Sequence, residues 1–273
     1  MTEHPRGLVA SAGWPVVHLY YRIDRSRWRG LGASDRRTAI DEFQQWLGQC
    51  ATEEGLQLVP MAGVTKSDFA IVAIHADLWR VQQLTQELAA TTFGACLNEV
   101  YSFLSMTEAS EYITNELDWS KLLIEEQKVD PASPDFATRI GQLRKRTAMY
   151  ADSRIHPQLP DNYPVICFYP MAKSRRDQDN WYRLSFEQRK QLMIQHGNSG
   201  RRFADRITQL ITTCTGIDDW EWGVTLFSKD LKAIRDIVYE LRYDEASAIY
   251  GLFGEFYIGI RFTPEQLATV LKL

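Results

Sequence analysis

The stretch LQLVPMAGVTKSDFAIVAI, residues 56–74, decides the fold of the first half of the chain. Two apolar runs rich in β-branched residues are separated by a short polar turn. Such runs are typical of strands, so two strands are expected in immediate succession, at Leu56–Val64 and Asp68–Ile74. The segments on either side of this pair indicate which fold contains it.

Helices and strands are expected on both flanks. Apolar residues at helical spacing predict a helix at Ser34–Cys50, with Ser34 as its N-cap, and another at Asp77–Thr91. Further strands are expected at the outer ends, Val16–Ile23 and Glu99–Met106. The resulting order, β-α-β-β-α-β, is that of a ferredoxin-like module.

The second half of the chain repeats this order. Its strands are expected at Val165–Met171, Leu210–Cys214, Trp220–Phe227 and Phe256–Phe262. Its helical stretches are Ser185–Gln209 and Lys229–Leu241, the latter with an apolar face that includes Leu231. Gly197 and Gly200 leave open whether the first stretch is one helix or two. The predicted fold class is therefore α+β, with two ferredoxin-like modules in tandem.

The segment between the two halves lacks this pattern. We expect an N-terminal module over residues 1–125, a connector over 126–160 and a C-terminal module over 161–273. The connector contains a proline-rich turn, Asp130–Pro134, and a basic helical stretch, Arg139–Arg146. Either a solvated linker helix or a helix in contact with another subunit fits this composition.

Composition limits the function classes. Of 273 residues, 45% are hydrophobic and 24% are charged, which is ordinary for a globular protein and excludes a disordered chain. Thirty-one basic and 35 acidic residues give a net charge of −4, so no overall attraction to nucleic acid is expected. The basic stretch Arg25–Gly30 is a local exception to which the sequence assigns no role.

Cysteine usage and hydropathy bear on location. The four cysteines form no Cys-x-x-Cys pair, which argues against a zinc ribbon or a disulfide framework and favours a reducing compartment. Residues 1–13 do not resemble a secretory signal, and no apolar run approaches the length of a membrane span. We therefore expect a cytoplasmic protein without an integral membrane segment.

No motif for nucleotide binding, a zinc protease or a serine hydrolase occurs. The histidines are never spaced as a multi-histidine metal helix would require; they are His4, His18, His75, His156 and His196. A site with one histidine remains, as in many haem proteins, although any one of these side chains alone is more often structural.

The strand CFYPMAK, residues 167–173, carries the most informative side chains. Tyr169, Met171 and Lys173 share one face because side chains alternate along a strand. They either line a cavity in which Lys173 meets an anion, or pack ordinarily on a strand whose end reaches solvent. Arg154 and Arg242 could bind carboxylates, although an arginine more often forms a surface ion pair.

The stretch WEWGVTLF, residues 220–227, places two tryptophans on one face of a strand. Gly223 between them could mark the close approach of a flat ligand or of another backbone. Packing of the tryptophans between sheets or subunits fits equally well.

Six segments of the second half occur in the order and spacing of a known family. They are YPMAK (169–173), NWY (180–182), QHG (195–197), DDWEWGVTLF (218–227), RYDEAS (242–247) and FGEFYIG (253–259). Over roughly residues 154–260 the chain resembles the coproheme decarboxylases of the HemQ type, in the chlorite dismutase-like superfamily. The first half is similar only in pattern, most clearly at Tyr101-Ser102-Phe103.

The resemblance implies a dimeric α+β barrel, assembled into a homopentamer. It also implies an activity, the hydrogen-peroxide-dependent oxidative decarboxylation of two propionates of iron coproporphyrin III (coproheme), giving haem b. A transient contact with a ferrochelatase would supply the porphyrin substrate. Two alternatives remain open, namely a non-catalytic haem carrier and a relative that degrades chlorite or acts as a peroxidase.

Site roles carry over position by position from the family. His196 resembles the iron ligand, Tyr169 the tyrosine that forms a radical, and Lys173 its partner at the second propionate. Gln209 corresponds to the residue above the iron, where a chlorite dismutase has an arginine; neutral glutamine therefore disfavours chlorite chemistry. The positions that would contact the porphyrin or its propionates are Met171, Arg154, Arg242 and Ser247.

Overall fold

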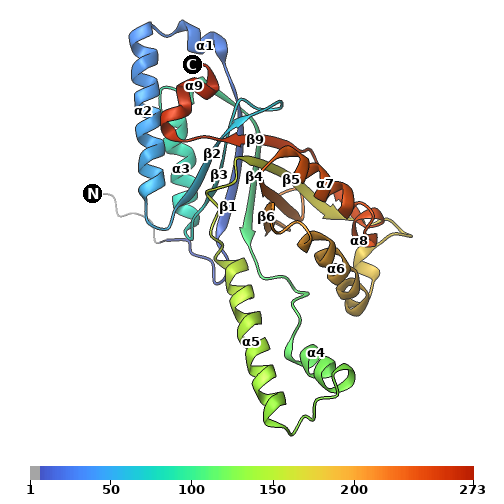
Figure 1. Cartoon of the computed structure of the whole chain (residues 1–273). Coiled ribbons are helices and arrows are strands. Elements are labelled where there is room, and N and C mark those ends of the chain that lie inside the picture. The colour runs from blue at the N-terminus through green and yellow to red at the C-terminus, as the bar shows by residue number, and fades with distance from the viewer. Residues whose placement is uncertain (1–6) are drawn as a thin grey trace.

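The structure, a computed structural model, describes residues 7–273 and contains two similar halves (Figure 1). The elements of the first half are β1 (Pro15–Ile23), α1 (Arg25–Gly30), α2 (Ala33–Thr52), β2 (Gln57–Gly63), β3 (Phe69–Ile74), α3 (Leu78–Ala90) and β4 (Leu97–Thr107). Those of the second half are β5 (Val165–Lys173), α6 (Phe186–Arg201), β6 (Ile207–Thr213), β7 (Trp222–Ser228), α7 (Leu231–Leu241), α8 (Glu245–Ala248), β8 (Gly251–Phe253), β9 (Tyr257–Arg261) and α9 (Leu267–Leu271).

The strands close into one antiparallel barrel. The first half is ordered β4-β1-β3-β2 and the second β6-β7-β5-β9, each the arrangement of a ferredoxin-like module. Two short seams join the halves: β4 pairs with β6 at Met106–Thr213 and Thr107–Thr212, and β2 pairs with β9 over Met61–Gly63. The predicted fold, a dimeric α+β barrel of two tandem ferredoxin-like modules, is confirmed.

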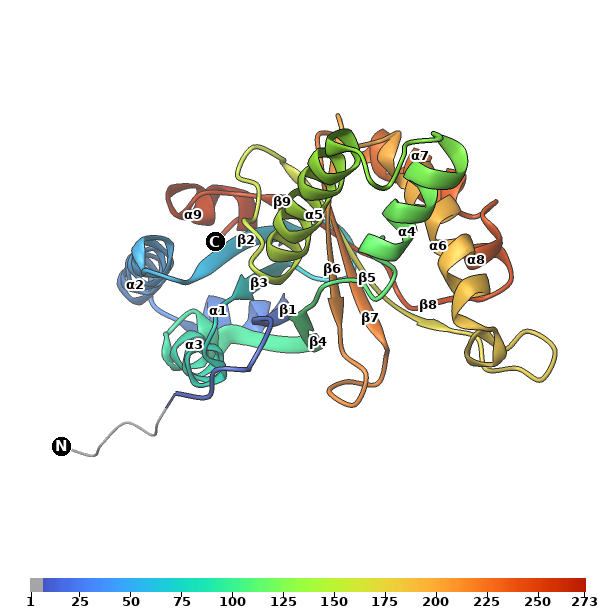
Figure 2. The ribbon, with the colours of Figure 1, turned by 90° about the horizontal axis from the view of Figure 1, so that it is seen from below.

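The barrel interior is an apolar core to which both modules contribute. Phe168 of β5 is fully buried there and stacks on His18 of β1, with ring centroids 4.1 Å apart. Seen from below, α2 and α3 lie on one side of the strands, and α6 and α8 lie on the other (Figure 2). Each module therefore has a second apolar layer between its sheet and its own helices.

The connecting segment extends away from the barrel as a helical hairpin (Figure 1). It contains α4 (Glu116–Lys121), a π-helical turn (Leu122–Glu126) and α5 (Pro134–Ile155), which begins after the N-cap Ser133. Ile140 is the one buried residue of α5, so the helix is largely solvated. The domain boundaries at residues 125 and 160 stay a prediction.

Two local predictions about helices are wrong. Ser34 is not the N-cap of α2, because the helix begins at Ala33 and Gly32 precedes it. The stretch Ser185–Gln209 is neither a helix to its end nor two helices, since α6 runs unbroken through both glycines and ends at Arg201. Ser185 and Gln188 form a capping box that fixes its start, and a glycine inside a helix costs only about 1 kcal/mol.

Three further side chains lie elsewhere than predicted. Gln209 is on β6 because the β-branched run ITQLITT, from residue 207, favours a strand. Leu231 is exposed and does not join the apolar face of α7. Trp220 precedes β7, which starts at Trp222, and packs against the barrel interior instead of alternating along the strand.

Candidate functional site

The outer face of β5 forms one wall of the candidate site. Cys167, Tyr169 and Met171 belong to the apolar layer between the second-module sheet and helix α7. The Tyr169 ring stacks on Phe256, with centroids 4.4 Å apart, and is 5% exposed. Burial raises the pKa of Tyr169, so its phenol is protonated at neutral pH.

Lys173 is buried at the end of the same strand. Its Nζ donates to the carbonyl oxygen of Ala246 at 2.7 Å and lies 4.3 Å from the ring centroid of Trp181. Its backbone N–H donates to Oε2 of Glu221, also at 2.7 Å. Burial lowers the pKa of Lys173 to about 8, although the nearby Glu221 carboxylate opposes this shift. The ammonium is therefore held beside α8, and no carboxylate among residues 7–273 forms an ion pair with it.

His196 projects from α6 toward the segment that connects α7 and α8. Its Nδ1 lies 3.2 Å from Oδ2 of Asp244 and 3.5 Å from Oγ of Ser247. The other carboxylate oxygen of Asp244 accepts a hydrogen bond of 2.8 Å from Ser199. The carboxylate favours the proton on Nδ1, while Nε2 has no hydrogen-bond partner among residues 7–273.

The charge state of His196 follows from its surroundings. Burial is the main cause that lowers the pKa of His196, and the positive charge of Lys173 lowers it further. The Asp244 carboxylate opposes both effects. The imidazole is therefore neutral at neutral pH and exposes a free nitrogen lone pair. A neutral histidine with a carboxylate close to its second nitrogen is similar to the arrangement that metal-binding histidines use.

The structure brings several of the predicted site residues together. They meet at the short segment from Asp244 to α8, which contains Ser247. Lys173 and His196 both contact this segment. The guanidinium carbon of Arg242 lies 5.8 Å from the ring centroid of Phe253. The ring centroids of Phe253 and Tyr169 are in turn 6.0 Å apart. The positive charge of Arg242 also opposes the rise in the pKa of Tyr169.

Gln209 faces the same layer from β6. Its amide lies 3.4 Å from the position that a Cβ would occupy on Gly200 of α6. Gly200 follows His196 by four residues, so both are on one face of the helix. Gln209 and His196 thus approach the layer from opposite sides, strand and helix.

Arg154 contacts none of the other predicted site residues. Its guanidinium lies at the end of α5 and donates to the carbonyl oxygen of Ile211, at 3.3 Å. Its buried Nε has no hydrogen-bond partner among residues 7–273. Ile211 is two positions from Gln209 on β6, which places Arg154 near the edge of the layer.

Three residues of this cluster were not predicted from the sequence. Asp244 contacts His196 across 48 positions, Glu221 binds the backbone of Lys173 across 48, and Trp181 covers its ammonium. Each lies inside a quoted segment of the second half, but periodicity does not pair residues so far apart. Only the rule that a ligating histidine is held by a carboxylate could have directed attention to Asp244.

The remaining candidates from the sequence serve other purposes. His18 is enclosed in the barrel, where Nε2 lies 2.8 Å from Oγ1 of Thr225 and burial lowers its pKa to about 3. His156 pairs with Asp152, and His4 lies outside the described residues. Gly223 does allow a close approach, but of the Phe103 ring inside the barrel: an added Cβ would lie 2.5 Å from it.

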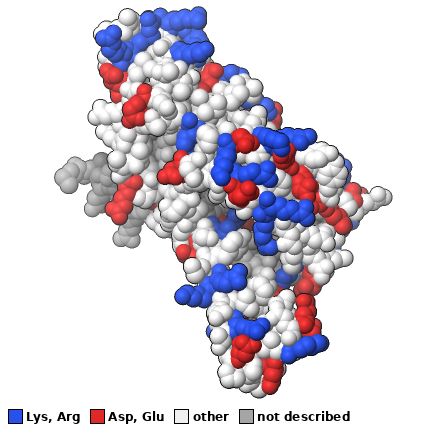
Figure 3. All heavy atoms as spheres, in the orientation of Figure 1, with Lys and Arg blue, Asp and Glu red and all other residues white. Residues whose placement is uncertain are grey.

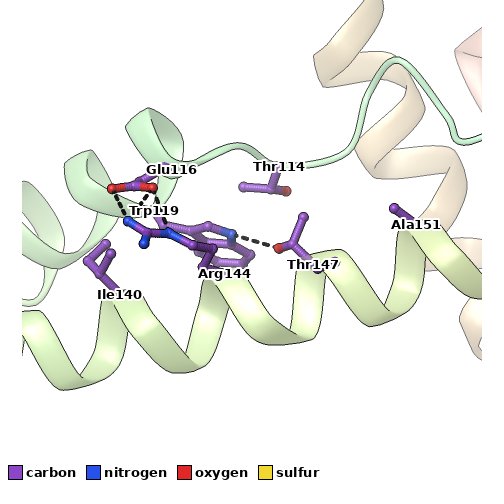
Figure 4. Close-up of a pocket in the computed structure, with 8 residues that line it drawn as sticks. Thr114, Glu116, Trp119, Ile140, Arg144, Thr147 and Ala151 are labelled. Atoms are coloured by element: carbon purple, nitrogen blue, oxygen red, sulfur yellow. Dashed lines mark hydrogen bonds and ion pairs between the residues drawn. The ribbon is translucent and has the colours of Figure 1, made fainter.

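A groove in the helical hairpin is separate from this site (Figure 4). Its volume is about 230 Å³, and its walls are formed by α4, α5 and Thr114, which precedes α4. Arg144 pairs with Glu116 across the groove, and the indole of Trp119 donates to Thr147 at 3.4 Å. None of the predicted site residues lines it.

The cluster around His196 fits a haem. A neutral imidazole with a free Nε2 suits an iron that brings its other ligands in a macrocycle. Lys173 and Arg242 are cations at the same layer and suit the carboxylates of a porphyrin. Within residues 7–273, no three His, Cys, Asp or Glu side chains are grouped so that they could hold a metal ion directly. In the same range, no helix is long and apolar enough to cross a membrane.

Comparisons with known proteins agree on one family. Residues 36–262 match the chlorite dismutase family. A protein of Halobacterium salinarum named "putative heme-binding protein" is 34% identical over 259 residues, 93% of this chain and 49% of that relative. One of the same description from Natronomonas pharaonis is 32% identical, over 94% of this chain and 40% of that relative. The chain thus spans half or less of the length of these curated relatives.

Solved structures give the same result. A heme-binding protein from Thermus thermophilus superposes with a TM-score of 0.79 at 31% identity, covering 99% of this chain and 100% of that one. A chlorite dismutase variant from Candidatus Nitrospira defluvii superposes with a TM-score of 0.70 at 15% identity, over 96% and 95% of the two chains. Because its sequence identity is only 15%, the similarity to the chlorite dismutase variant supports the fold alone. By sequence and by structure, this chain belongs to the chlorite dismutase family.

Proposed function

We propose that this chain is a coproheme decarboxylase, which converts iron coproporphyrin III to haem b with hydrogen peroxide as the oxidant. The observation that carries the proposal is that Lys173, on the strand face of Tyr169, and His196 of α6 both contact the segment Asp244–Ser247. A radical-forming phenol, a carboxylate-binding ammonium and an iron ligand are the three groups that this reaction requires.

In this proposal, His196 holds the iron through Nε2, and Asp244 orients the imidazole from the Nδ1 side. The bound iron porphyrin, with peroxide, supplies the oxidising power. Lys173 and Arg242 bind propionate carboxylates, with Ser247 and Met171 beside them. Gln209 offers a neutral amide over the iron, and Arg154 contacts a propionate at the edge of the layer.

Tyr169 performs the step on the substrate arm. Its phenol gives up a proton and an electron, and its oxygen then takes a hydrogen atom from a propionate. The propionate releases carbon dioxide and becomes a vinyl group, a two-electron oxidation that one hydrogen peroxide balances by forming two water molecules. Two such rounds give haem b.

The test is a titration of the purified chain, loaded with iron coproporphyrin III, with hydrogen peroxide. Mass spectrometry of the extracted porphyrin should show the stepwise loss of two carboxyl groups. A porphyrin that keeps all four carboxyl groups, under conditions in which it is bound, would refute the enzyme assignment.

A second candidate is haem binding without catalysis, which the descriptions of the archaeal and Thermus relatives favour. It expects the same change in the porphyrin absorption spectrum on binding, but no mass loss with peroxide. Chlorite degradation is a third candidate, and oxygen release from chlorite would support it despite the neutral Gln209.

The resemblance also leads us to propose a cytoplasmic homopentamer that receives its substrate in transient contact with a ferrochelatase. Sedimentation of the purified chain measures the subunit number. Transfer of coproheme from a loaded ferrochelatase, faster than its release into solution, would support the contact.

A further inference from the structure

A pocket in the first module includes part of the basic stretch Arg25–Gly30, to which the sequence assigns no role. The pocket has a volume of about 440 Å³ and is lined by Arg25, Trp28, Arg29, Arg36 and Lys272. These residues come from α1, the first turns of α2 and the end of α9, which lie together at one end of the molecule (Figure 1). Lys and Arg side chains gather at this end (Figure 3). The haem-site residues all belong to the second module or the end of α5.

None of the four cations of the pocket is neutralised. Among residues 7–273, no carboxylate lies within 4.0 Å of the charged nitrogens of Arg25, Arg29, Arg36 or Lys272. Arg27 of the same short helix is different, because it pairs with Asp24 and does not line the pocket. The pocket therefore concentrates four positive charges.

Two of the cations are fixed in place by neutral groups. Arg25 donates to the carbonyl oxygens of Leu271 and Lys272, at 3.1 and 3.2 Å. Arg36 donates to the carbonyl oxygen of Leu31 at 2.8 Å and to that of Arg29 at 3.3 Å. Carbonyl acceptors orient a guanidinium without cancelling its charge. The guanidinium groups of Arg25 and Arg36 are therefore positioned to bind an anion.

A packed core lies beneath the pocket. Trp28 is 4% exposed and packs edge-on against Phe93, with centroids 5.6 Å apart, in the core beneath α1. Arg29 and Lys272 are exposed, and their side chains form no hydrogen bond within residues 7–273, which leaves them free to close over a ligand. Asp35, the acidic residue in the first turn of α2, does not line the pocket.

We propose that this pocket binds a small oligophosphate, such as the diphosphate group of a nucleotide or inorganic pyrophosphate. Guanidinium groups match the oxygens of phosphate with paired hydrogen bonds. A phosphate group carries close to two negative charges and a carboxylate only one, so a diphosphate balances four cations compactly. The pocket lies on the module that contributes no proposed haem ligand, and is a second ligand site of the chain.

The test uses the full chain, with inorganic pyrophosphate as the probe. Isothermal titration at physiological salt should detect binding that weakens as salt is added. The double variant Arg29→Gln, Lys272→Gln removes two cations that make no structural hydrogen bond, and should lose affinity at least about tenfold, as the loss of two charge-assisted contacts predicts. Arg37→Gln is the matched control, since Arg37 is an exposed neighbour of Arg36 outside the pocket.

The outcomes decide the proposal separately from the haem assignment. Pyrophosphate binding that Arg37→Gln weakens as much as the double variant would show only diffuse surface charge, and overturns it. Citrate binding as tightly as pyrophosphate overturns the preference for phosphate, and so does an absence of pyrophosphate binding. The double variant should keep the circular dichroism spectrum and the unfolding midpoint of the parent chain, which confirms, independently of haem binding, that the chain is folded.

Discussion

Tyr169 is the residue whose replacement should separate binding from chemistry. The variant Tyr169→Phe keeps the ring that stacks on Phe256 but lacks the O–H, so it should bind coproheme and fail to decarboxylate it. Absorption titration measures binding, and mass spectrometry after peroxide measures turnover. Tyr150→Phe, on the exposed face of α5, is the control and should keep full activity. Normal turnover by Tyr169→Phe would remove the radical role.

Asp244 should set the strength of the iron ligand. In Asp244→Asn, the group beside Nδ1 of His196 loses its charge, and the imidazole becomes a weaker ligand. We expect a roughly 10- to 100-fold loss of coproheme affinity, as for other residues that support a metal ligand. Glu240→Gln, which breaks a surface pair with Arg202, should leave the affinity unchanged. Equal affinity of both variants would mean that Asp244 does not support the ligand.

Lys173 should make stability depend on pH. Burial lowers its pKa from 10.5 to about 8, so between these values the unfolded chain binds more protons than the folded one. The free energy of unfolding of the ligand-free protein therefore gains a contribution as the pH rises through this range. Relative to Lys173→Met, the parent chain should become more stable between pH 8 and pH 10, by chemical denaturation.

The matched control for this pH effect is Lys121→Met, which alters an exposed lysine of α4. Its stability difference from the parent chain should not change over the same pH range. Other groups that titrate there are shared by all three proteins and cancel in the comparison. A constant difference for Lys173→Met would contradict the buried ammonium.

The sequence could predict which residue types the site needs but not all of their partners. Tyr169 and Met171 follow from strand alternation, since β5 has one face toward the helices. The contact of Asp244 with His196 depends on where α7 ends and α8 begins, and the contact of Lys173 with Ala246 depends on the same turn. Such contacts are set by tertiary packing, which local periodicity does not encode.

At the scale of the elements, the predicted strand and helix ends lie within two residues of the observed ones, except at the end of α6 and the start of β6. The apolar runs of β1, β3 and β5 are unambiguous because these strands are buried on both faces or nearly so. The polar stretch after α6 is ambiguous, because helix and strand propensities compete there. Short elements such as α1, α4 and β8 have too few residues to show a period.

Gly223 should be irreplaceable within β7. In Gly223→Ala, the new Cβ would meet the Phe103 ring and lie 3.0 Å from Oγ1 of Thr212, inside a packed core. We expect a loss of about 1–3 kcal/mol in the free energy of unfolding, measured by denaturant titration. Gly141→Ala is the control, because nothing lies within 4 Å of its Cβ in α5, and it should stabilise by roughly 0.5–1 kcal/mol. An unchanged stability of Gly223→Ala would contradict the close packing.

At the scale of the whole molecule, the shared barrel core should make the two modules unfold together. Phe168 belongs to the second module but packs on His18, Tyr20 and Phe103 of the first. Phe168→Ala should therefore cost about 3–5 kcal/mol and keep a single unfolding transition. Tryptophan fluorescence and circular dichroism should report the same midpoint. Two separated transitions would show that the modules are independent.

The closure of the sheet also limits how copies of this chain can associate. Every long strand already has a neighbour on each side, and the three-residue β8 is the only described strand with an open side. Besides β8, a second copy finds free backbone only where the short seams leave parts of β4, β6 and β2 unpaired across the junction of the two modules. Away from those places, contacts between copies of the chain depend on side chains, so point substitutions on the helices can alter them without touching the hydrogen-bond ladder.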